Sequence, residues 1–153
     1  MDAFTDRVAL VTGSSRGIGA ATAKLLADRG ARVVVNYHSD EAAAQETASE
    51  IRSNDGEALV VQADVREPKD VERMVDTATD EWGLIDILVT NANMPFAKKS
   101  IAEISWEEFA QKPTDELAAA FHPTKAVLPG MVEQNYGRLV YVSSGLGEHP
   151  APG

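Results

Sequence analysis

Residues 12–19 have the sequence Thr12-Gly13-Ser14-Ser15-Arg16-Gly17-Ile18-Gly19, between the apolar run of residues 8–11 and a helical pattern that begins at Ile18. Glycines let the backbone turn tightly and approach a ligand closely, and a helix start offers free N–H groups and a partial positive charge. A glycine-rich turn between a buried strand and a helix is therefore suited to phosphate binding. A purely structural turn is the alternative. We expect the turn to bind the pyrophosphate of a dinucleotide at the end of the first strand.

The composition is that of one soluble globular domain. The 153 residues are 44% hydrophobic and 25% charged. No apolar run approaches the ~18 residues that span a bilayer, and the N-terminus lacks the apolar core of a signal peptide. Cysteine is absent, which excludes disulfides and thiolate chemistry. We expect a cytoplasmic protein without a membrane partner.

Charge and histidine spacing narrow the class of ligand. The net charge is −10, which argues against a nucleic-acid surface. His38, His122 and His149 are scattered without the spacing of metal ligands, so we expect no metal site.

Five apolar runs predict strands at residues 7–11, 31–35, 57–62, 84–90 and 138–143. Most are continuous rather than alternating, which is typical of strands covered on both faces. Helical patterns separate them, so the sequence predicts an α/β fold, a doubly wound parallel sheet of the Rossmann type. Residues 104–136 contain Pro113, Pro123 and Pro129, which predict two helices or one broken helix.

Several segments resemble the short-chain dehydrogenase/reductase family. The glycine spacing in residues 12–19 is similar to that family's turn, and Ala63-Asp64-Val65 is similar to its adenine-contacting step. Residues 86–93 resemble its Asp-Ile-Leu-Val-Asn-Asn-Ala-Gly strand end, and residues 137–144 resemble the strand that carries its catalytic serine. Within the family, the chain is most similar to 3-oxoacyl-carrier-protein reductases.

The resemblance implies a cofactor site at the glycine turn and at the ends of the following strands. Its expected members are Gly13, Ser14, Ser15, Arg16, Gly17, Ile18, Gly19, Asn36, Tyr37, His38, Ser39, Asp64, Val65, Asn91, Ala92 and Asn93. For two of these residues, a purely structural role is an alternative to cofactor binding. Asp64 is also compatible with a role at a helix start only, and Asn91 with hydrogen bonds between neighbouring strands.

The end of the second strand favours NADP(H) over NAD. NAD-preferring folds usually place a carboxylate there, but residues 35–39 are Val-Asn-Tyr-His-Ser. Nothing in that run repels a 2′-phosphate, Arg16 can bring a positive charge to it, and Asn36 and Ser39 can donate hydrogen bonds. The alternative is that Arg16 is only a solvated surface residue. The nearby acidic residues Asp40 and Glu41 weigh against the preference for NADP(H).

The resemblance also implies a catalytic set of tyrosine, lysine, serine and asparagine, of which this sequence contains only part. Ser144 matches the serine, whereas Glu116 stands in place of the asparagine and cannot donate as an amide does. Asn93 replaces a glycine of the family pattern. The Tyr-x-x-x-Lys pair, expected a little over a dozen positions after Ser144, does not occur in the 153 residues.

We therefore interpret residues 1–153 as the cofactor-binding domain of a longer enzyme, with five strands present, the C-terminal strands missing and no activity alone. The expected function is an NADP(H)-dependent oxidoreductase that reduces a small carbonyl compound or oxidises the alcohol. We expect the full-length form to be a homodimer or homotetramer that uses residues 104–136 as an interface. The alternative is a non-catalytic nucleotide-binding module or subunit.

Overall fold

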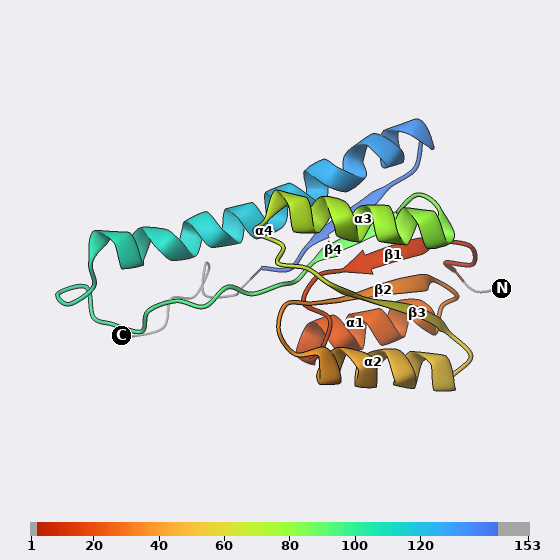
Figure 1. Ribbon diagram of the computed structural model, residues 1–153, viewed down its shortest axis with the longest axis horizontal. Helices are drawn as coiled ribbons and strands as arrows, with labels where there is room; N and C mark the ends of the chain where they lie inside the picture. The colour runs from red at the N-terminus through yellow and green to blue at the C-terminus, as the bar shows by residue number, and fades with distance from the viewer. Residues whose placement is uncertain (1–2, 144–153) are drawn as a thin grey trace.

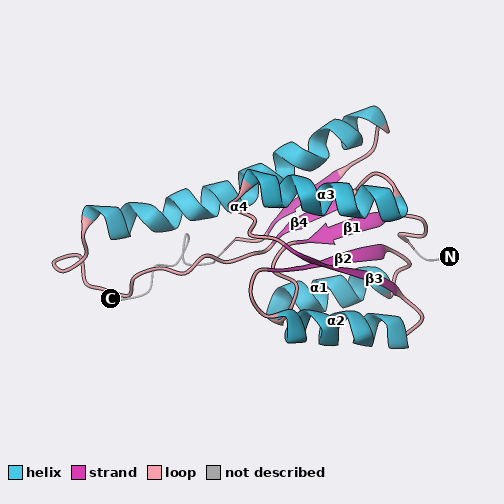
Figure 2. Cartoon of the chain, viewed as in Figure 1, coloured by secondary structure: helices cyan, strands magenta, loops and turns pink. Residues whose placement is uncertain are grey.

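The computed structural model describes residues 3–143. Its strands and helices alternate along the chain (Figures 1 and 2). The strands are β1 (Val8–Val11), β2 (Arg32–Tyr37), β3 (Glu57–Gln62), β4 (Ile87–Thr90) and β5 (Arg138–Tyr141). The helices are α1 (Gly17–Ala27), α2 (Glu41–Ser53), α3 (Pro68–Trp82) and α4 (Trp106–Glu133).

All five strands are parallel, in the order β3-β2-β1-β4-β5. The chain builds outward from β1 to β3, then crosses back so that β4 pairs with the other side of β1. The central Leu10 of β1 accordingly lies between Val34 of β2 and Leu88 of β4. This reversal makes the carboxyl ends of β1 and β4 a topological switch point, where such sheets bind ligands. The predicted doubly wound fold is confirmed.

Helices cover both faces of the sheet. Helices α1 and α2 lie on one face, and α3 and α4 on the other (Figure 2). Along β1, Leu10 packs in the cluster that contains Met74 of α3 and Met131 of α4, whereas Val11 packs in the cluster that contains Ala23 of α1. Both sets of side chains are buried, which explains why the strands are continuous apolar runs.

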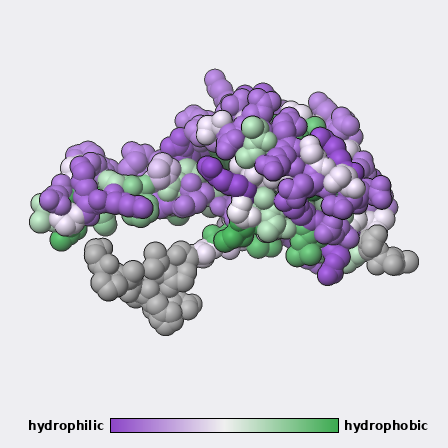
Figure 3. Space-filling view, turned by 90° about the horizontal axis from the view of Figure 1, so that it is seen from below, coloured by the Kyte–Doolittle hydropathy of each residue, from purple (hydrophilic) through white to green (hydrophobic). Residues whose placement is uncertain are grey.

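Helix α4 is one continuous helix of 28 residues, so the expectation of two helices or a broken one is wrong. A capping box between Ser105 and Glu108 fixes its start. Pro123 is fully buried against the core, where packing offsets the lost backbone bond. The hydroxyls of Thr114 and Thr124, each just after a proline, donate to carbonyls four residues earlier at 2.8 Å. The first half of α4 projects beyond the sheet and carries apolar among hydrophilic side chains (Figures 1 and 3).

Strand β5 differs from the other strands in exposure. It lies at the edge of the sheet, and all four of its residues are exposed although its sequence is largely apolar. Within residues 3–143, none of the helices combines the length and hydropathy of a membrane span.

Candidate functional site

A pocket of about 480 Å³ opens at the carboxyl ends of β1, β2 and β4. Its predicted lining residues are Gly13, Ser15, Arg16, Ile18, Asn36, Tyr37, His38, Ser39, Asp64, Asn91, Ala92 and Asn93. Asp40, Arg66, Met94 and Pro95 also line it and were not predicted. Ser14, Gly17, Gly19 and Val65 were expected in the site but do not line the pocket. The structure thus brings most of the predicted residues together at the switch point.

Backbone conformation or lack of space explains why three positions of the turn are glycine. Gly13 and Gly17 have φ of +60° and +59°, a region that side chains disfavour. A Cβ on Gly13 would also lie 2.8 Å from the Cα of Ala92. A Cβ on Gly19 would lie 2.5 Å from Nδ2 of Asn91, whereas one on Gly17 would meet no atom within 4 Å. The turn therefore packs tightly against the end of β4 and is open at Gly17.

Asn36 and Ser14 hold the turn against β2. The Oδ1 atom of the buried Asn36 accepts the N–H of Gly13 at 3.0 Å, and its Nδ2 donates to the carbonyl of Ala63 at 3.2 Å. Ser14 Oγ accepts the N–H of Asn36 at 3.0 Å and donates to the carbonyl of Val11 at 2.7 Å. The Asn36 amide is thus directed at the main chain, in contrast to the expected hydrogen bond from Asn36 to a ribose phosphate.

Asn91 and Thr12 join the end of β4 to the same turn. Asn91 Nδ2 donates to the carbonyls of Thr12 and Gly13 at 3.1 and 3.0 Å. In return, Thr12 Oγ1 accepts the N–H groups of Asn91 and Ala92 at 2.9 and 3.1 Å. The cross-strand role considered for Asn91 is therefore present, and the residue lines the pocket as well.

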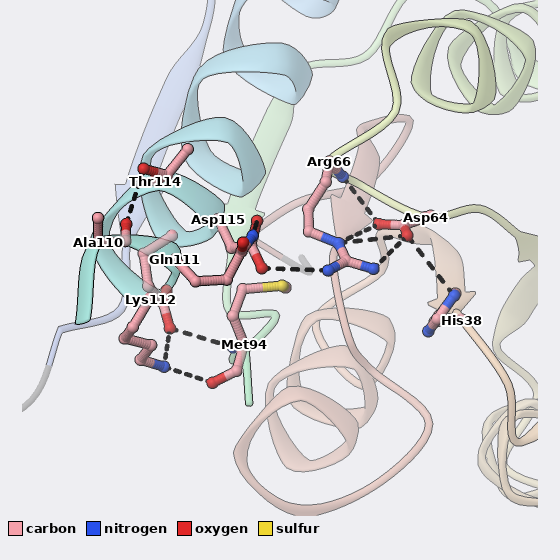
Figure 4. Close-up of polar contacts among 10 residues, drawn as sticks. His38, Asp64, Arg66, Met94, Ala110, Gln111, Lys112, Thr114 and Asp115 are labelled. Carbon is pink, nitrogen blue, oxygen red and sulfur yellow. Dashed lines mark hydrogen bonds and ion pairs between the residues drawn. The ribbon is translucent and has the colours of Figure 1, made fainter. Parts of the chain in front are cut away.

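A cluster of charged side chains lies where the segment after β3 meets the pocket. Arg66 donates to both carboxylate oxygens of Asp64, at 2.7 to 3.2 Å, and to Asp115 of α4 at 3.1 Å (Figure 4). His38 Nε2 lies 3.6 Å from Oδ2 of Asp64, one of the two oxygens that Arg66 contacts. Hydrogen bonds from Arg66 lower the pKa of Asp64 to about 2, and the same bonds raise the pKa of Arg66. The pocket therefore contains a carboxylate that stays ionised.

The alternative role of Asp64 at a helix start is not what the structure shows. The N-cap of α3 is Glu67, and the carboxylate of Asp64 instead accepts the N–H of Arg66 at 3.0 Å. The N–H of Asp64 in turn donates to Asp70 at 3.0 Å. Asp64 thus shapes the turn before α3 and faces the pocket. Its position two residues before Arg66 was the one local signal for the ion pair.

Arg16 stands at the mouth of the pocket. It is the N-cap residue of α1, its side chain is 78% exposed, and its Nη1 lies 3.7 Å from a carboxylate oxygen of Asp40. Tyr37 lies nearby with a raised pKa, caused by burial and by the carboxylate of Glu41. Arg16 is thus free to reach a ligand, in competition with Asp40.

Glu116 lies beside the segment that follows β4. Its Oε1 accepts the N–H of Met94 at 3.0 Å and pairs with Lys112 one helical turn earlier. Lys112 Nζ also donates to the carbonyl of Met94 (Figure 4). It donates to Oδ1 of Asn93 as well, at 2.9 Å. The catalytic role considered for Glu116 stays a prediction. The sequence analysis gave no role to Lys112, although the i,i+4 spacing was a usable signal.

One catalytic expectation, Ser144, remains. Ser144 lies outside the described residues. Tyr141 hydrogen-bonds Thr124 through its hydroxyl at 2.9 Å, and the ring of Tyr136 lies 3.8 Å from the guanidinium of Arg7. Both tyrosines are thus engaged away from the pocket lining, as structural aromatic residues.

The chain belongs to the short-chain dehydrogenase family, whose members use nicotinamide cofactors. A model of that family, described as short chain dehydrogenase, matches residues 7–153. The chain is 40% identical over 153 residues to a 3-oxoacyl-[acyl-carrier-protein] reductase from Synechocystis sp., covering 100% of this chain and 62% of that protein. It is 35% identical over 150 residues to glucose 1-dehydrogenase 2 from Bacillus subtilis, covering 97% of this chain and 58% of that protein.

A solved structure shows the same architecture. A short-chain type dehydrogenase/reductase from Mycobacterium marinum matches with a TM-score of 0.90 at 32% sequence identity, over 98% of this chain and 60% of that one. The chain spans about three fifths of the length of these relatives.

Proposed function

We propose that this chain binds NADP(H) for an oxidoreductase that reduces a small carbonyl compound or oxidises the corresponding alcohol. The observation that carries the proposal is the glycine turn at the switch point. Its glycines exclude side chains from the contact with β4, and the start of α1 faces the same pocket. A helix N-terminus beside a close-approach turn favours a pyrophosphate.

The arrangement of the strands suggests how the dinucleotide lies. The ends of β2 and β3 flank one side of the turn and the end of β4 flanks the other. We infer that the adenosine half lies over His38 and Asp64, and that the nicotinamide half lies beside Asn91 and Asn93. The Asp64 carboxylate, ionised because its pKa is about 2, is suited to accept a hydrogen bond from the adenine amino group.

Preference for NADP(H) over NAD rests on Arg16. No carboxylate ends β2, and the exposed guanidinium of Arg16 can pair with a 2′-phosphate once it leaves Asp40. Ser39, which also lines the pocket, is suited to donate a hydrogen bond to the same phosphate. Asn36 serves the site by fixing the turn.

The chemistry follows from the family. NADPH supplies a hydride when bound, and we propose that Ser144 orients the substrate carbonyl and stabilises the charge that develops on its oxygen. No tyrosine–lysine pair of the family type occurs in the 153 residues, so we predict that the chain alone does not turn over substrate. The Synechocystis relative suggests a 3-oxoacyl thioester, and the B. subtilis relative suggests a sugar, as substrate class.

The cofactor assignment is tested by Arg16→Ala. We expect the NADPH dissociation constant to rise about tenfold or more, because a charge-assisted hydrogen bond is lost, while NADH binding changes little. Titration calorimetry with both nucleotides measures this. Arg29→Ala is the matched control, because Arg29 is an exposed arginine beyond the other end of α1. Equal losses of NADPH and NADH affinity in Arg16→Ala contradict the assignment.

A non-catalytic nucleotide-binding module is the second candidate, favoured by Glu116 and Asn93 at positions where the family pattern has asparagine and glycine. The protein expressed from its complete reading frame separates the two candidates. Oxidation of NADPH with 3-oxoacyl thioesters or simple ketones supports the enzyme. Tight NADPH binding without turnover across the panel supports the module.

The proposal extends to assembly and location. Helix α4 exposes Phe109, Leu117 and Phe121, which supports a homodimer or homotetramer formed through this helix. The cytoplasmic location expected from composition stays a prediction. Sedimentation of the complete protein tests the assembly, since a monomer at micromolar concentration contradicts it.

A further inference from the structure

Two charged side chains on α4 hold the segment that follows β4. Lys112 and Glu116 are one helical turn apart, so both face the same way. Lys112 Nζ contacts Oδ1 of Asn93, the carbonyl of Met94 and the Glu116 carboxylate. The segment and the helix are thus joined by a cluster that includes main-chain groups as well as an ion pair.

Both main-chain polar groups of Met94 are bound by this pair. Glu116 Oε1 accepts the Met94 N–H at 3.0 Å, and Lys112 donates to the Met94 carbonyl at 2.5 Å. A single amide side chain contains both an acceptor and a donor, whereas a carboxylate only accepts. Lys112 therefore supplies the donor that Glu116 lacks.

We propose that Lys112 and Glu116 act as one positioning unit, a two-residue replacement for the single amide side chain expected at position 116. The unit fixes Met94, which is 8% exposed, and with it Asn93 in the wall of the pocket. Neither residue is proposed to touch the reacting atoms. The inference depends on the proposed function only where it identifies this wall as the nicotinamide side.

A second ion pair joins the same two segments and provides a comparison. Lys99 Nζ contacts Glu108 Oε1 at 2.5 Å, between the segment after β4 and the first turn of α4. No hydrogen bond from Lys99 to the main chain accompanies that pair among the described residues. Lys99→Met therefore removes a similar charge pair without releasing a main-chain group from a lysine.

Removal of Lys112 alone is expected to expose the Met94 N–H more than removal of both the Lys112 and the Glu116 charges. In Lys112→Met the Glu116 carboxylate faces the Met94 carbonyl and Asn93 Oδ1 without a cation, so it turns to solvent and releases the Met94 N–H. In the double variant Lys112→Met with Glu116→Gln, the glutamine amide offers both an acceptor and a donor to Met94. The second substitution should therefore rescue the first.

The experiment is hydrogen exchange of the Met94 amide by NMR, without nucleotide. We expect exchange about tenfold faster in Lys112→Met, because a charge-assisted bond is lost, and a rate within about threefold of the starting protein in the double variant. Glu116→Gln alone and Lys99→Met should change it little. Equal rates in Lys112→Met, Glu116→Gln and the double variant indicate a simple ion pair and overturn the proposal, as does an equal effect of Lys99→Met.

NADPH affinity of the same variants separates this inference from the proposed function. If the wall contacts the nicotinamide half, the dissociation constant follows the order of the exchange rates. If the exchange rates behave as expected and NADPH affinity does not change, the positioning unit stands and the cofactor assignment of this wall fails.

Discussion

The two walls of the pocket are held by different forces. On the side of the glycine turn, neutral groups make the contacts: the buried Asn36, Ser14 and Thr12 and the half-buried Asn91 bond to main-chain atoms. On the side of α4, charged and partly exposed side chains make them, in Asp64–Arg66–Asp115 and in Lys112–Glu116.

This difference predicts different behaviour of the two walls. Buried neutral hydrogen bonds do not titrate and are costly to break, so the turn should be rigid and insensitive to salt. Partly exposed ion pairs weaken with salt and with acid. The turn therefore provides a rigid site for the pyrophosphate, which all dinucleotides share. The wall on the side of α4 is the one that salt and pH can alter.

The largest effect is expected at Gly19, where the neutral wall has no room. An alanine inside a helix normally adds about 1 kcal/mol of stability over glycine. Here its Cβ would lie 2.5 Å from Asn91 Nδ2 and from the Gly13 carbonyl oxygen. We expect Gly19→Ala to lower the free energy of unfolding by about 3 kcal/mol in urea denaturation.

Gly130→Ala is the control for that substitution. Gly130 is also helical, but the atom nearest to its Cβ would be Cδ2 at the end of the Leu84 side chain, at 3.0 Å. We expect a change below about 1 kcal/mol. A Gly19→Ala protein as stable as the Gly130→Ala protein means that the turn and β4 are not tightly packed.

The next largest effect is expected at Asn36. Alanine there leaves the half-buried N–H of Gly13 and the carbonyl of the buried Ala63 without the side-chain partner, which costs about 2–3 kcal/mol. Asn54→Ala, at an exposed asparagine after α2, should cost less than about 1 kcal/mol. Thermal unfolding of both variants measures the difference, and comparable losses argue against a special role for the neutral wall.

A smaller loss of stability is expected in acid, and of the two walls of the pocket only the charged one should contribute to it. A carboxylate whose pKa is lowered on folding stabilises the folded state above its unfolded pKa, and this stability is lost as pH falls through the folded pKa. For Asp64 these values are 3.8 and about 2, so up to about 2 kcal/mol should disappear between pH 4 and pH 2.

Arg66→Met isolates this contribution. Without the guanidinium, the pKa of Asp64 should return toward its ordinary value, and the loss of stability between pH 4 and pH 2 should shrink. NMR titration of the Asp64 carboxyl with urea denaturation at each pH measures both quantities. An unchanged Asp64 pKa in Arg66→Met shows that Arg66 does not hold the carboxylate.

The fold and the glycine turn could be predicted from sequence because their signals are local. Continuous apolar runs identified buried parallel strands, and glycine spacing identified the turn. The direction of the Asn36 amide was not predictable, since it depends on the carbonyl of Ala63 in the segment after β3. The continuity of α4 was missed because burial of Pro123 is a tertiary effect that propensity does not contain.

Most contacts of the charged wall could not be predicted from the sequence. Arg66 and Asp115 are 49 residues apart, and only the fold brings α4 beside the segment between β3 and α3. Lys112 carried a local signal, its spacing from Glu116, but that spacing alone does not show that both bind the main chain of Met94.

The proposed function depends on main-chain amides of the glycine turn that bind the pyrophosphate of a dinucleotide. The most direct test is NMR titration of the backbone amides with NADPH. We expect the largest chemical-shift changes at residues 13–19, and the free energy of unfolding should rise by about 2.7 kcal/mol at a hundredfold excess of NADPH over the dissociation constant. Saturating NADPH that leaves those amides and the melting temperature unchanged would contradict it.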